Sequence, residues 1–468
     1  MKKYLIFTFL LLSMAVACKK TTPAPVIITP IEPKPTTYTI PDNAVSIIIK
    51  TDGLIVDEPK VKGTIKIMQK DSVVFENSMG IEIRGAVSQL LYEKKSYGFE
   101  LWDNNNVGIT RSIWGMPEDE DWILHGPYAD KTLVRNAVAY QISNSIGKYA
   151  SRTTFVELTI NNNYKGVYVL MEKIKRNKNR VDIKKLTSTD NDSTKITGGY
   201  ILKMDKTAGD GTTTNSHINY MTTNSFPSLL DAFGKPATTA TKIVTHFLYD
   251  YPKKEDITPQ QTAYIKQYVQ NFEGTLASDS FKNVATGYNK YMDADNFIDH
   301  FLLNELMQNH DAYRLSTYLM KERGEKLKMG PIWDMDITFG SDGFCFGMKD
   351  NVWVYRYNNL CPDDTWLVPF WWKRLLEDPA FSQKVKARWA VLRRDKFSDA
   401  VLEKIITDHL AYLNKIGAPK RNFDRWNVLS TPIVPNISFI GTYDQEIDRM
   451  KRWLKTRAAW IDANINQL

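Results

Sequence analysis

The spacing of hydrophobic positions changes along the chain from a strand period to a helix period. In the first half, alternating or β-branched-rich runs predict strands at residues 45–50, 63–69, 81–84, 96–102, 155–160 and 164–174. The last two runs are joined by Asn161-Asn162-Asn163, a sequence typical of a tight hairpin turn. A helical period from Lys131 to Ile146 predicts one helix among these strands. This half should therefore fold as a strand-rich unit with a single helix.

The second half is dominated by helical periodicity. Thr258-Pro259 supplies a capping residue followed by a proline at the first helical position, and apolar residues then recur at helical spacing. Similar patterns predict helices at 295–309, 370–395, 398–415 and 444–465. Residues 207–242 are rich in Thr, Ser, Gly and Asn and predict a long surface insertion. The chain is thus expected to be an α+β protein in two lobes, a strand-rich N-lobe at 43–206 and a helical C-lobe at 207–468.

The N-terminal segment predicts export and attachment to a lipid. Two lysines precede an apolar run and a few small residues before Cys18, which is the order of a secretory signal followed by a lipidation cysteine. Residues 1–17 would be removed, and residues 18–42, with a proline every few positions, predict an extended tether. We expect an exported lipoprotein, periplasmic or at the cell surface, that meets the membrane through its lipid only. The alternative is an ordinary signal peptide with a chance cysteine.

Charge and cysteine content narrow the list of partners. The formal net charge of +8 falls to +6 when Lys2 and Lys3 leave with the signal. Because basic and acidic residues are scattered without a basic tail, we expect no nucleic-acid partner, and we expect a monomer. With Cys18 used by the anchor, Cys345 and Cys361 remain, either as a disulfide in an oxidising compartment or as two thiols.

The segment at 305–342 is the most informative about chemistry. Asp311 is followed five residues on by Ser316 and, after a longer gap, by Asp334 and Asp336 in the run Trp-Asp-Met-Asp. Phosphoryl transfer needs one carboxylate to accept the proton of an attacking hydroxyl, and a second, with a small oxygen ligand, to hold Mg²⁺. Asp311 fits the first role, and Asp334 with Ser316 fits the second. Aspartates also cap helices and turns, so the order of strands, helix, hairpin and helices before the pair is what makes it informative.

Several stretches together resemble the spore-coat-protein-H (CotH) kinase family over nearly the whole globular length. They are IRGAVSQLLYEKKSYGFEL, DWILHGPYADKTLVRNAVAYQI, YKGVYVLMEKI, TGGYILKMD, FIDHFLLNELMQNHDAYRLSTYLM, GPIWDMDITFG and WKRLLEDPAF. The resemblance implies an atypical protein-kinase-like fold and a Ser/Thr protein kinase that uses ATP with Mg²⁺, or Mn²⁺, on secreted or envelope proteins. By motif position, Asp311 would be the catalytic base and Asp334 the metal ligand, with Ser316 and Asp336 in support.

The nucleotide side of such a site is less sharply defined by the sequence. A kinase carries a lysine on the strand before its lone helix, and Lys95 is the choice over its neighbour because it shares a strand face with Tyr97 and Phe99. Arg84 precedes this strand, and Arg135 stands on the helix where kinases carry a glutamate. Glu172 ends the hairpin strand, where a hinge to adenine would run. The alternative for these residues is a surface charge or a salt bridge.

Other catalytic signatures are missing from the sequence. It has no P-loop, HExxH or GxSxG motif, and its histidines lack the spacing of a zinc site. Two alternatives to an active kinase remain. One is a pseudokinase that keeps the fold and transfers nothing, and the other is a binding scaffold of the cell envelope. Metal-dependent nucleotide binding would distinguish a kinase or pseudokinase from a binding scaffold. Phosphate transfer would then distinguish the active kinase from the pseudokinase.

Overall fold

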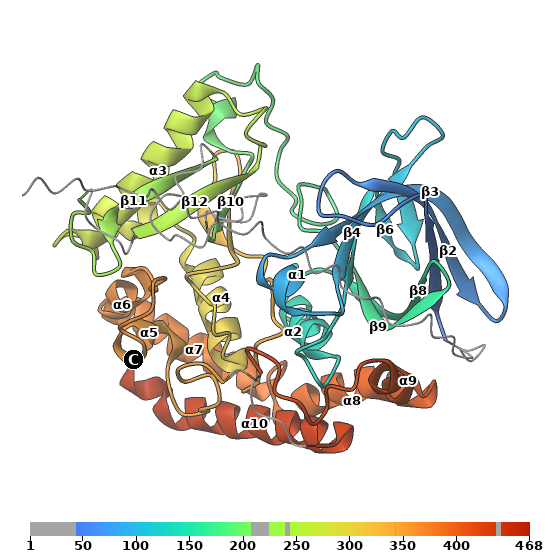
Figure 1. The fold of residues 1–468 in the computed structure, drawn as a ribbon. Coiled ribbons are helices and arrows are strands. Elements are labelled where there is room, and N and C mark those ends of the chain that lie inside the picture. Colours follow the sequence, from blue (N-terminus) through green and yellow to red (C-terminus); the bar gives the residue numbers. More distant parts are fainter. Residues whose placement is uncertain (1–43, 207–223, 239–243, 342, 437–440) are drawn as a thin grey trace, which may run out of the picture. The chain divides into compact units, whose positions relative to one another are not determined.

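The first half of the chain forms a closed β-barrel in the computed structural model, which describes residues 44–206, 224–238, 244–341, 343–436 and 441–468 (Figure 1). The strand order is β1-β2-β3-β4-β7-β9-β8, and parallel pairing of β1 with β8 closes the barrel. The strands are β1 Ser46–Thr51, β2 Val61–Gln69, β3 Ser72–Arg84, β4 Ser96–Trp102, β7 Asp121–His125, β8 Thr153–Ile160 and β9 Asn163–Glu172. A short ribbon, β5 Arg111–Ile113 with β6 Met116–Asp119, leads into β7.

Strand β9 shows why the barrel is joined firmly to the rest of the protein. All of its residues are buried, although successive side chains of a strand point to opposite faces. Tyr168 and Leu170 belong to the core inside the barrel. Val167 and Val169 instead join the large core that includes helix α2 (Arg135–Ser145). A strand buried on both faces is expected to carry a continuous hydrophobic run, and residues 167–171 of β9 form one.

Helix α2 begins four residues later than the periodicity predicts, because Asp130 builds a turn in front of it. Its carboxylate accepts hydrogen bonds from the backbone amides of Thr132 (3.0 Å) and Arg135 (2.9 Å). Leu133, inside this turn, has a left-handed φ of 67°. A second short helix, α1 Val87–Leu91, follows β3 and was not predicted.

A second sheet lies in the region predicted to be helical. Its order is β11-β12-β10-β13-β14, with β10 Tyr200–Met204, β11 Ser225–Asp231, β12 Val244–Tyr251, β13 Thr317–Lys321 and β14 Leu327–Met329. Strand β10, which precedes the predicted lobe boundary at 206, pairs with β12 and β13, which follow it. The predicted insertion at 207–242 contributes β11 to this sheet, while its residues 207–223 and 239–242 lie outside the described residues.

Helices make up most of the remaining chain. They are α3 Pro259–Ala277, α4 Ala294–Met307, α5 Tyr357–Leu360, α6 Trp371–Leu376, α7 Pro379–Arg394, α8 Asp399–Lys415, α9 Ala418–Arg425 and α10 Tyr443–Asn464. The predicted helix at 370–395 is two helices, since Asp378 caps the amide of Ala380 and Pro379 opens α7. Helix α3 packs along β11, and α10 packs against α4 and α8 (Figure 1).

The mixture of strands and helices confirms the α+β class. The described residues fall in one compact unit. Among them, no helix has both the length and the apolar character needed to cross a bilayer. The predicted signal peptide, Cys18 and the proline-rich tether lie outside the described residues.

Candidate active site

The turn between α4 and β13 carries Asp311. Gln308 ends α4 in a left-handed conformation with φ of 46°, which reverses the chain. The backbone amide of Asp311 then donates to the Oδ1 of Asn309 at 3.2 Å. Its carboxylate accepts a hydrogen bond of 2.8 Å from Nη2 of Arg314, and the side chain is 22% exposed. Asp311 is thus held by a guanidinium and still reaches solvent.

The hairpin of β13 and β14 brings Ser316 to Asp334. Ser316 directly precedes β13, Asp334 follows β14, and the Ser316 hydroxyl donates to Asp334 Oδ2 at 3.3 Å. Both residues have left-handed backbones, with φ of 47° and 59°. Such a conformation is uncommon for residues other than glycine and is found often at functional sites.

Asp311, Asp334 and Asp336 influence one another electrostatically. Burial, and next the charge of Asp311, raises the pKa of Asp334. Burial, and next the charge of Asp334, raises the pKa of Asp336 well above its usual range, with smaller contributions from Asp130 and Asp311. The three predicted carboxylates therefore lie close enough for their charges to act on one another, and we call them the aspartate cluster. A cluster of this kind favours either bound protons or a bound cation.

Met335, between the two aspartates, is held by two asparagines that the sequence analysis did not single out. Its backbone amide donates to Oδ1 of Asn136 on α2 at 2.8 Å. Its sulfur accepts a contact of 3.4 Å from Nδ2 of Asn309. Asn136 also meets Nε2 of His125, at the end of β7, at 3.1 Å. The barrel, α2 and the turn bearing Asp311 are thus all joined to the aspartate run.

Two cations from different sheets interact electrostatically with Asp334. Arg84 ends β3 and lies over the ring of Trp333 at 5.5 Å. Burial lowers the pKa of Arg84, whereas the charge of Asp334 opposes that shift. Lys203, on β10, is paired with Asp205, and its ammonium lies 5.8 Å from the centre of the Tyr318 ring. The charge of Lys203 lowers the pKa of Asp334, but the larger effect of burial raises it. Arg84 was predicted from the sequence and Lys203 was not, although it stands in the quoted stretch TGGYILKMD.

The prediction that Lys95 is the inward-facing lysine is wrong. Its ammonium donates to the carbonyl oxygens of Gln89 and Tyr92, where it closes the end of α1. The neighbouring Lys94 is the buried one, only 1% exposed, and it donates to the carbonyl oxygen of Val167 at 2.6 Å. Lys95 precedes β4, so the alternation of the strand does not govern the direction of its side chain.

Arg135 and Glu172 are also used in structural ion pairs. Arg135 is fully buried; it is paired with Asp130 and donates to the carbonyl oxygen of Thr338 at 3.0 Å. Glu172 is fully buried and accepts from the backbone amide of Arg152 at 3.0 Å and from its guanidinium. Both residues form salt bridges, the alternative that the sequence left open, and their contacts with a nucleotide stay a prediction.

A hollow of about 110 Å³ lies on the outer face of the barrel beside Arg84. Glu82 and Arg84 on β3, with Gly98 on β4, share this face of the barrel, because Glu82 and Gly98 are cross-strand partners. A Cβ on Gly98 would meet Glu82 Oε1 at 3.0 Å, so the absence of a side chain keeps the face open. The full lining is Lys60, Glu82, Arg84, Gly98, Phe99, Asp121, Trp122 and Lys173.

A second acidic group, Asp119, Glu120 and Asp121, lies near this hollow with its carboxylates close together. Lys175 fills the position that a cation would take. Its ammonium lies 3.3 Å from Asp119, 2.9 Å from Glu120 and 2.6 Å from Asp121. This group is therefore a salt-bridge cluster.

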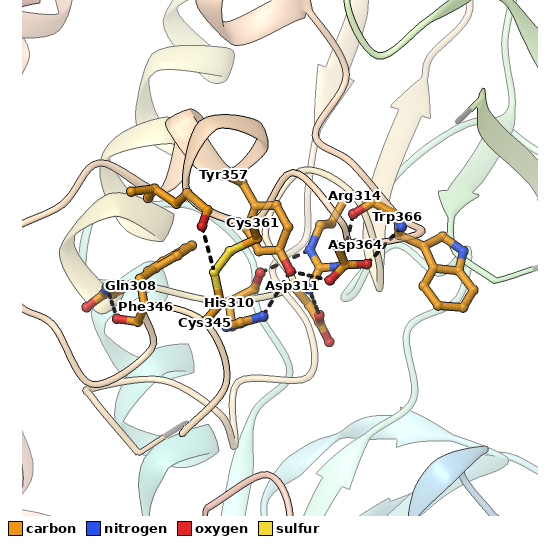
Figure 2. The surroundings of a disulfide bond; sticks show 11 residues. Gln308, His310, Asp311, Arg314, Cys345, Phe346, Tyr357, Cys361, Asp364 and Trp366 are labelled. Atoms are coloured by element: carbon orange, nitrogen blue, oxygen red, sulfur yellow. Dashed lines mark hydrogen bonds and ion pairs between the residues drawn. A yellow bond between two sulfur atoms is a disulfide. The ribbon is translucent and has the colours of Figure 1, made fainter. Parts of the chain in front are cut away.

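Cys345 and Cys361 form a disulfide, with Cα atoms 6.1 Å apart. This is one of the two states that the sequence left open. Figure 2 shows that the bond lies beside the turn bearing Asp311, with Phe346 and Tyr357 next to His310. The segment that follows the aspartate run is thus cross-linked next to the candidate base.

Comparison with known proteins identifies the family of the chain. The model of the CotH kinase protein family matches residues 81–461, a range that begins near the end of β3 and includes every residue of the aspartate cluster. The chain therefore belongs to the CotH kinase protein family. A search of curated proteins found no match.

Proposed function

We propose that this protein transfers the γ-phosphoryl group of ATP to a Ser or Thr hydroxyl of an envelope or secreted protein. The observation that carries the proposal is the cluster of Asp311, Asp334 and Asp336, with Ser316 bonded to Asp334. One of these carboxylates follows α4, and the other two follow the β13 and β14 hairpin. Phosphoryl transfer requires such a division between a base and a metal site.

The donor atoms of Asp334, Asp336 and Ser316 suit a hard cation such as Mg²⁺ or Mn²⁺. All are oxygens, and the raised pKa values of both aspartates reflect negative charge that is buried without enough compensation. These three residues would hold the ion, which would supply a counter-charge for the phosphates. Arg84 and Lys203, whose charges interact with that of Asp334, would contact phosphate oxygens.

Asp311 has the surroundings expected of the base. Its side chain is 22% exposed, so an acceptor hydroxyl from solvent can approach it. Its Oδ1 accepts from Arg314, which fixes the direction of the carboxylate. In this role Asp311 orients the hydroxyl and takes its proton as the oxygen bonds to phosphorus.

The hollow on the barrel face is the proposed place of the adenine and ribose. Arg84 lines the hollow and also interacts with Asp334. A nucleotide that spans the hollow and the aspartate cluster would therefore have its adenine at the barrel and its phosphates at the aspartates. Gly98 leaves room in the hollow, and Lys60 and Lys173 in its lining carry positive charge. The proposed attachment to a lipid at Cys18 would hold this site outside the cytoplasm.

Two substitutions with different expected effects test the proposal. Asp334→Ala should abolish Mg²⁺-dependent ATP binding and phosphate transfer, because the phosphate charge loses its main counter-ion. Asp311→Asn should leave ATP affinity within a few-fold while it lowers transfer by a factor on the order of 10² or more.

Binding is measured by calorimetry, and transfer with labelled ATP and an envelope lysate. Asp408→Asn, at an exposed pair on α8, is the control. If both site variants bind ATP as the parent does and the parent transfers nothing, the protein is a scaffold.

A further inference from the structure

The loop closed by the disulfide packs against the residue that precedes Asp311. The ring of Phe346 stacks on His310 with centroids 5.5 Å apart, and the ring of Tyr357 meets His310 edge-on at 5.3 Å. The Tyr357 hydroxyl also lies 3.2 Å from Nε2 of His310. Both aromatic residues lie between Cys345 and Cys361, so one cross-linked loop encloses the imidazole (Figure 2).

Arg314 connects this loop to the carboxylate of Asp311. Its side chain is only 4% exposed, and its guanidinium lies over the ring of Tyr357 at 4.1 Å. Nη2 donates to Asp311 Oδ1 at 2.8 Å, and Nη1 donates to the carbonyl oxygen of Trp366 at 3.1 Å. The Tyr357 ring therefore supports one face of a guanidinium that makes both of these bonds.

Tyr357 also binds Asp364, the second carboxylate near Arg314. Its hydroxyl donates to Oδ2 of Asp364, and that oxygen lies 3.5 Å from Nη1 of Arg314. Arg314 therefore stands between two carboxylates, Asp311 and Asp364. A small shift of the guanidinium toward Asp364 would turn it away from Asp311. The ring and hydroxyl of Tyr357 fix its place between them.

We propose that Arg314 and Tyr357 are positioning residues for Asp311, and that the Cys345–Cys361 disulfide keeps Tyr357 in the place this requires. The inference rests on the proposed phosphoryl transfer and adds to it a fixed support for the base. It follows that the segment after the aspartate run needs no separate event to order it, because a covalent bond holds it against the catalytic turn. Misplacement of a reacting group by about 1 Å can cost on the order of 10²-fold in rate, so the support affects turnover more than binding.

The test compares three variants of the full chain with two matched control variants. Arg314→Lys keeps the charge and loses the planar fork, Tyr357→Phe keeps the ring and loses the hydroxyl, and Cys345→Ser with Cys361→Ser removes the cross-link. The controls, Arg356→Lys and Tyr355→Phe, lie in the same loop and bond to each other instead of to the catalytic turn. Each of the Arg314, Tyr357 and cysteine variants should lower kcat by about 10-fold or more with the KM for ATP within about twofold.

A measurement that does not need turnover accompanies the kinetics. Amide hydrogen exchange across residues 309–316 should become faster in the cysteine variant and in Tyr357→Phe, and should stay at the parent level in both controls. Parent values of kcat and of exchange in these variants would overturn the inference while the proposed function stands. A parent protein that transfers no phosphate would instead overturn the proposed function, and with it the role assigned to Arg314 and Tyr357.

Discussion

The side-chain oxygen of Asn136 accepts a hydrogen bond of 2.8 Å from the backbone amide of Met335. The two residues are 199 positions apart in the chain, and the bond joins helix α2 to the short run that contains Asp334 and Asp336. Since Asn136 is only 4% exposed, the amide of Met335 would have no water to replace this partner. The spacing of the two candidate metal ligands is thus set in part by a helix of the barrel half.

The first prediction follows from this bond. Asn136→Ala should lower the free energy of unfolding by about 1–3 kcal/mol, because a buried amide loses its acceptor. It should also weaken Mg²⁺-dependent ATP binding, since the backbone between the aspartates is no longer held. Denaturant unfolding and calorimetry measure the two effects. Asn144→Ala, on the same helix but bonded to Ala150, should cost stability and leave ATP binding unchanged. Equal binding losses in both variants would contradict the prediction.

A second prediction concerns the disulfide as a source of stability. It closes a loop with a sequence separation of 16 residues. In the chain-entropy model, removing it by Cys345→Ser with Cys361→Ser lowers the free energy of unfolding by about 3 kcal/mol. Reversible denaturation without reductant measures the difference. Dithiothreitol should destabilise the parent and have no effect on the double variant. A parent protein insensitive to the reductant would contradict the prediction.

A third prediction is a pH dependence that comes from Glu273. This carboxylate on α3 accepts from Ser228 (2.7 Å) and Trp371 (3.0 Å), and burial raises its pKa from the ordinary 4.5 to about 7. The folded protein therefore binds this proton more tightly than the unfolded chain does. The contribution to stability is complete below about pH 4.5 and is lost as the pH rises through 7, with a maximum of about 3 kcal/mol.

The variant Glu273→Gln isolates this contribution. The amide is neutral throughout, so the variant should gain stability relative to the parent as the pH rises from about 5 to 8. Unfolding in denaturant at a series of pH values measures the gain. The exposed Glu255→Gln serves as the control and should give a curve parallel to that of the parent. Parallel curves for the parent and Glu273→Gln would show that Glu273 does not titrate in this range.

Local signals explain how much of the fold could be predicted. Thr258 forms a capping box with Gln261 at the start of α3, as its sequence context predicts. Asn161 and Asn162 adopt left-handed φ values of 51° and 63° in the turn of the β8 and β9 hairpin. These features depend on neighbours in the chain, so a single sequence contains them. The sheet of β10 to β14 could not be found in this way, because it is assembled from segments far apart in the sequence.

The same limit separates the site residues that were predicted from those that were not. Asp311, Ser316 and Asp334 lie within one short segment, and their spacing, together with the order of predicted strands and helices before them, identifies them as a set. The direction of Lys94 depends on partners up to 328 residues away, among them Asn422 (2.8 Å), and nothing in the local pattern points to it. The burial of Arg135 depends in the same way on Asp130 and on the carbonyl of Thr338, 203 residues away.

The last prediction concerns Lys203, the cation that the sequence analysis did not assign. It is the cross-strand partner of Tyr318 in the pairing of β10 with β13, two residues after Ser316. Its positive charge acts on Asp334, whose pKa it lowers against the larger effect of burial, and phosphate oxygens bound at Asp334 would therefore lie within its reach. Lys203→Met should weaken ATP binding in the presence of Mg²⁺ by about tenfold, or about 1.4 kcal/mol, the scale of one charge-assisted hydrogen bond. Lys203→Arg, which keeps the charge, should lose less. Lys328→Met, paired with Glu325 on the same sheet, is the control and should bind ATP as the parent does. Calorimetric titration at one ionic strength measures all four proteins, since salt screens such contacts. If Lys203→Met binds ATP as tightly as the control, the lysine only pairs with Asp205, and the phosphates must be held by Arg84 and the metal ion alone.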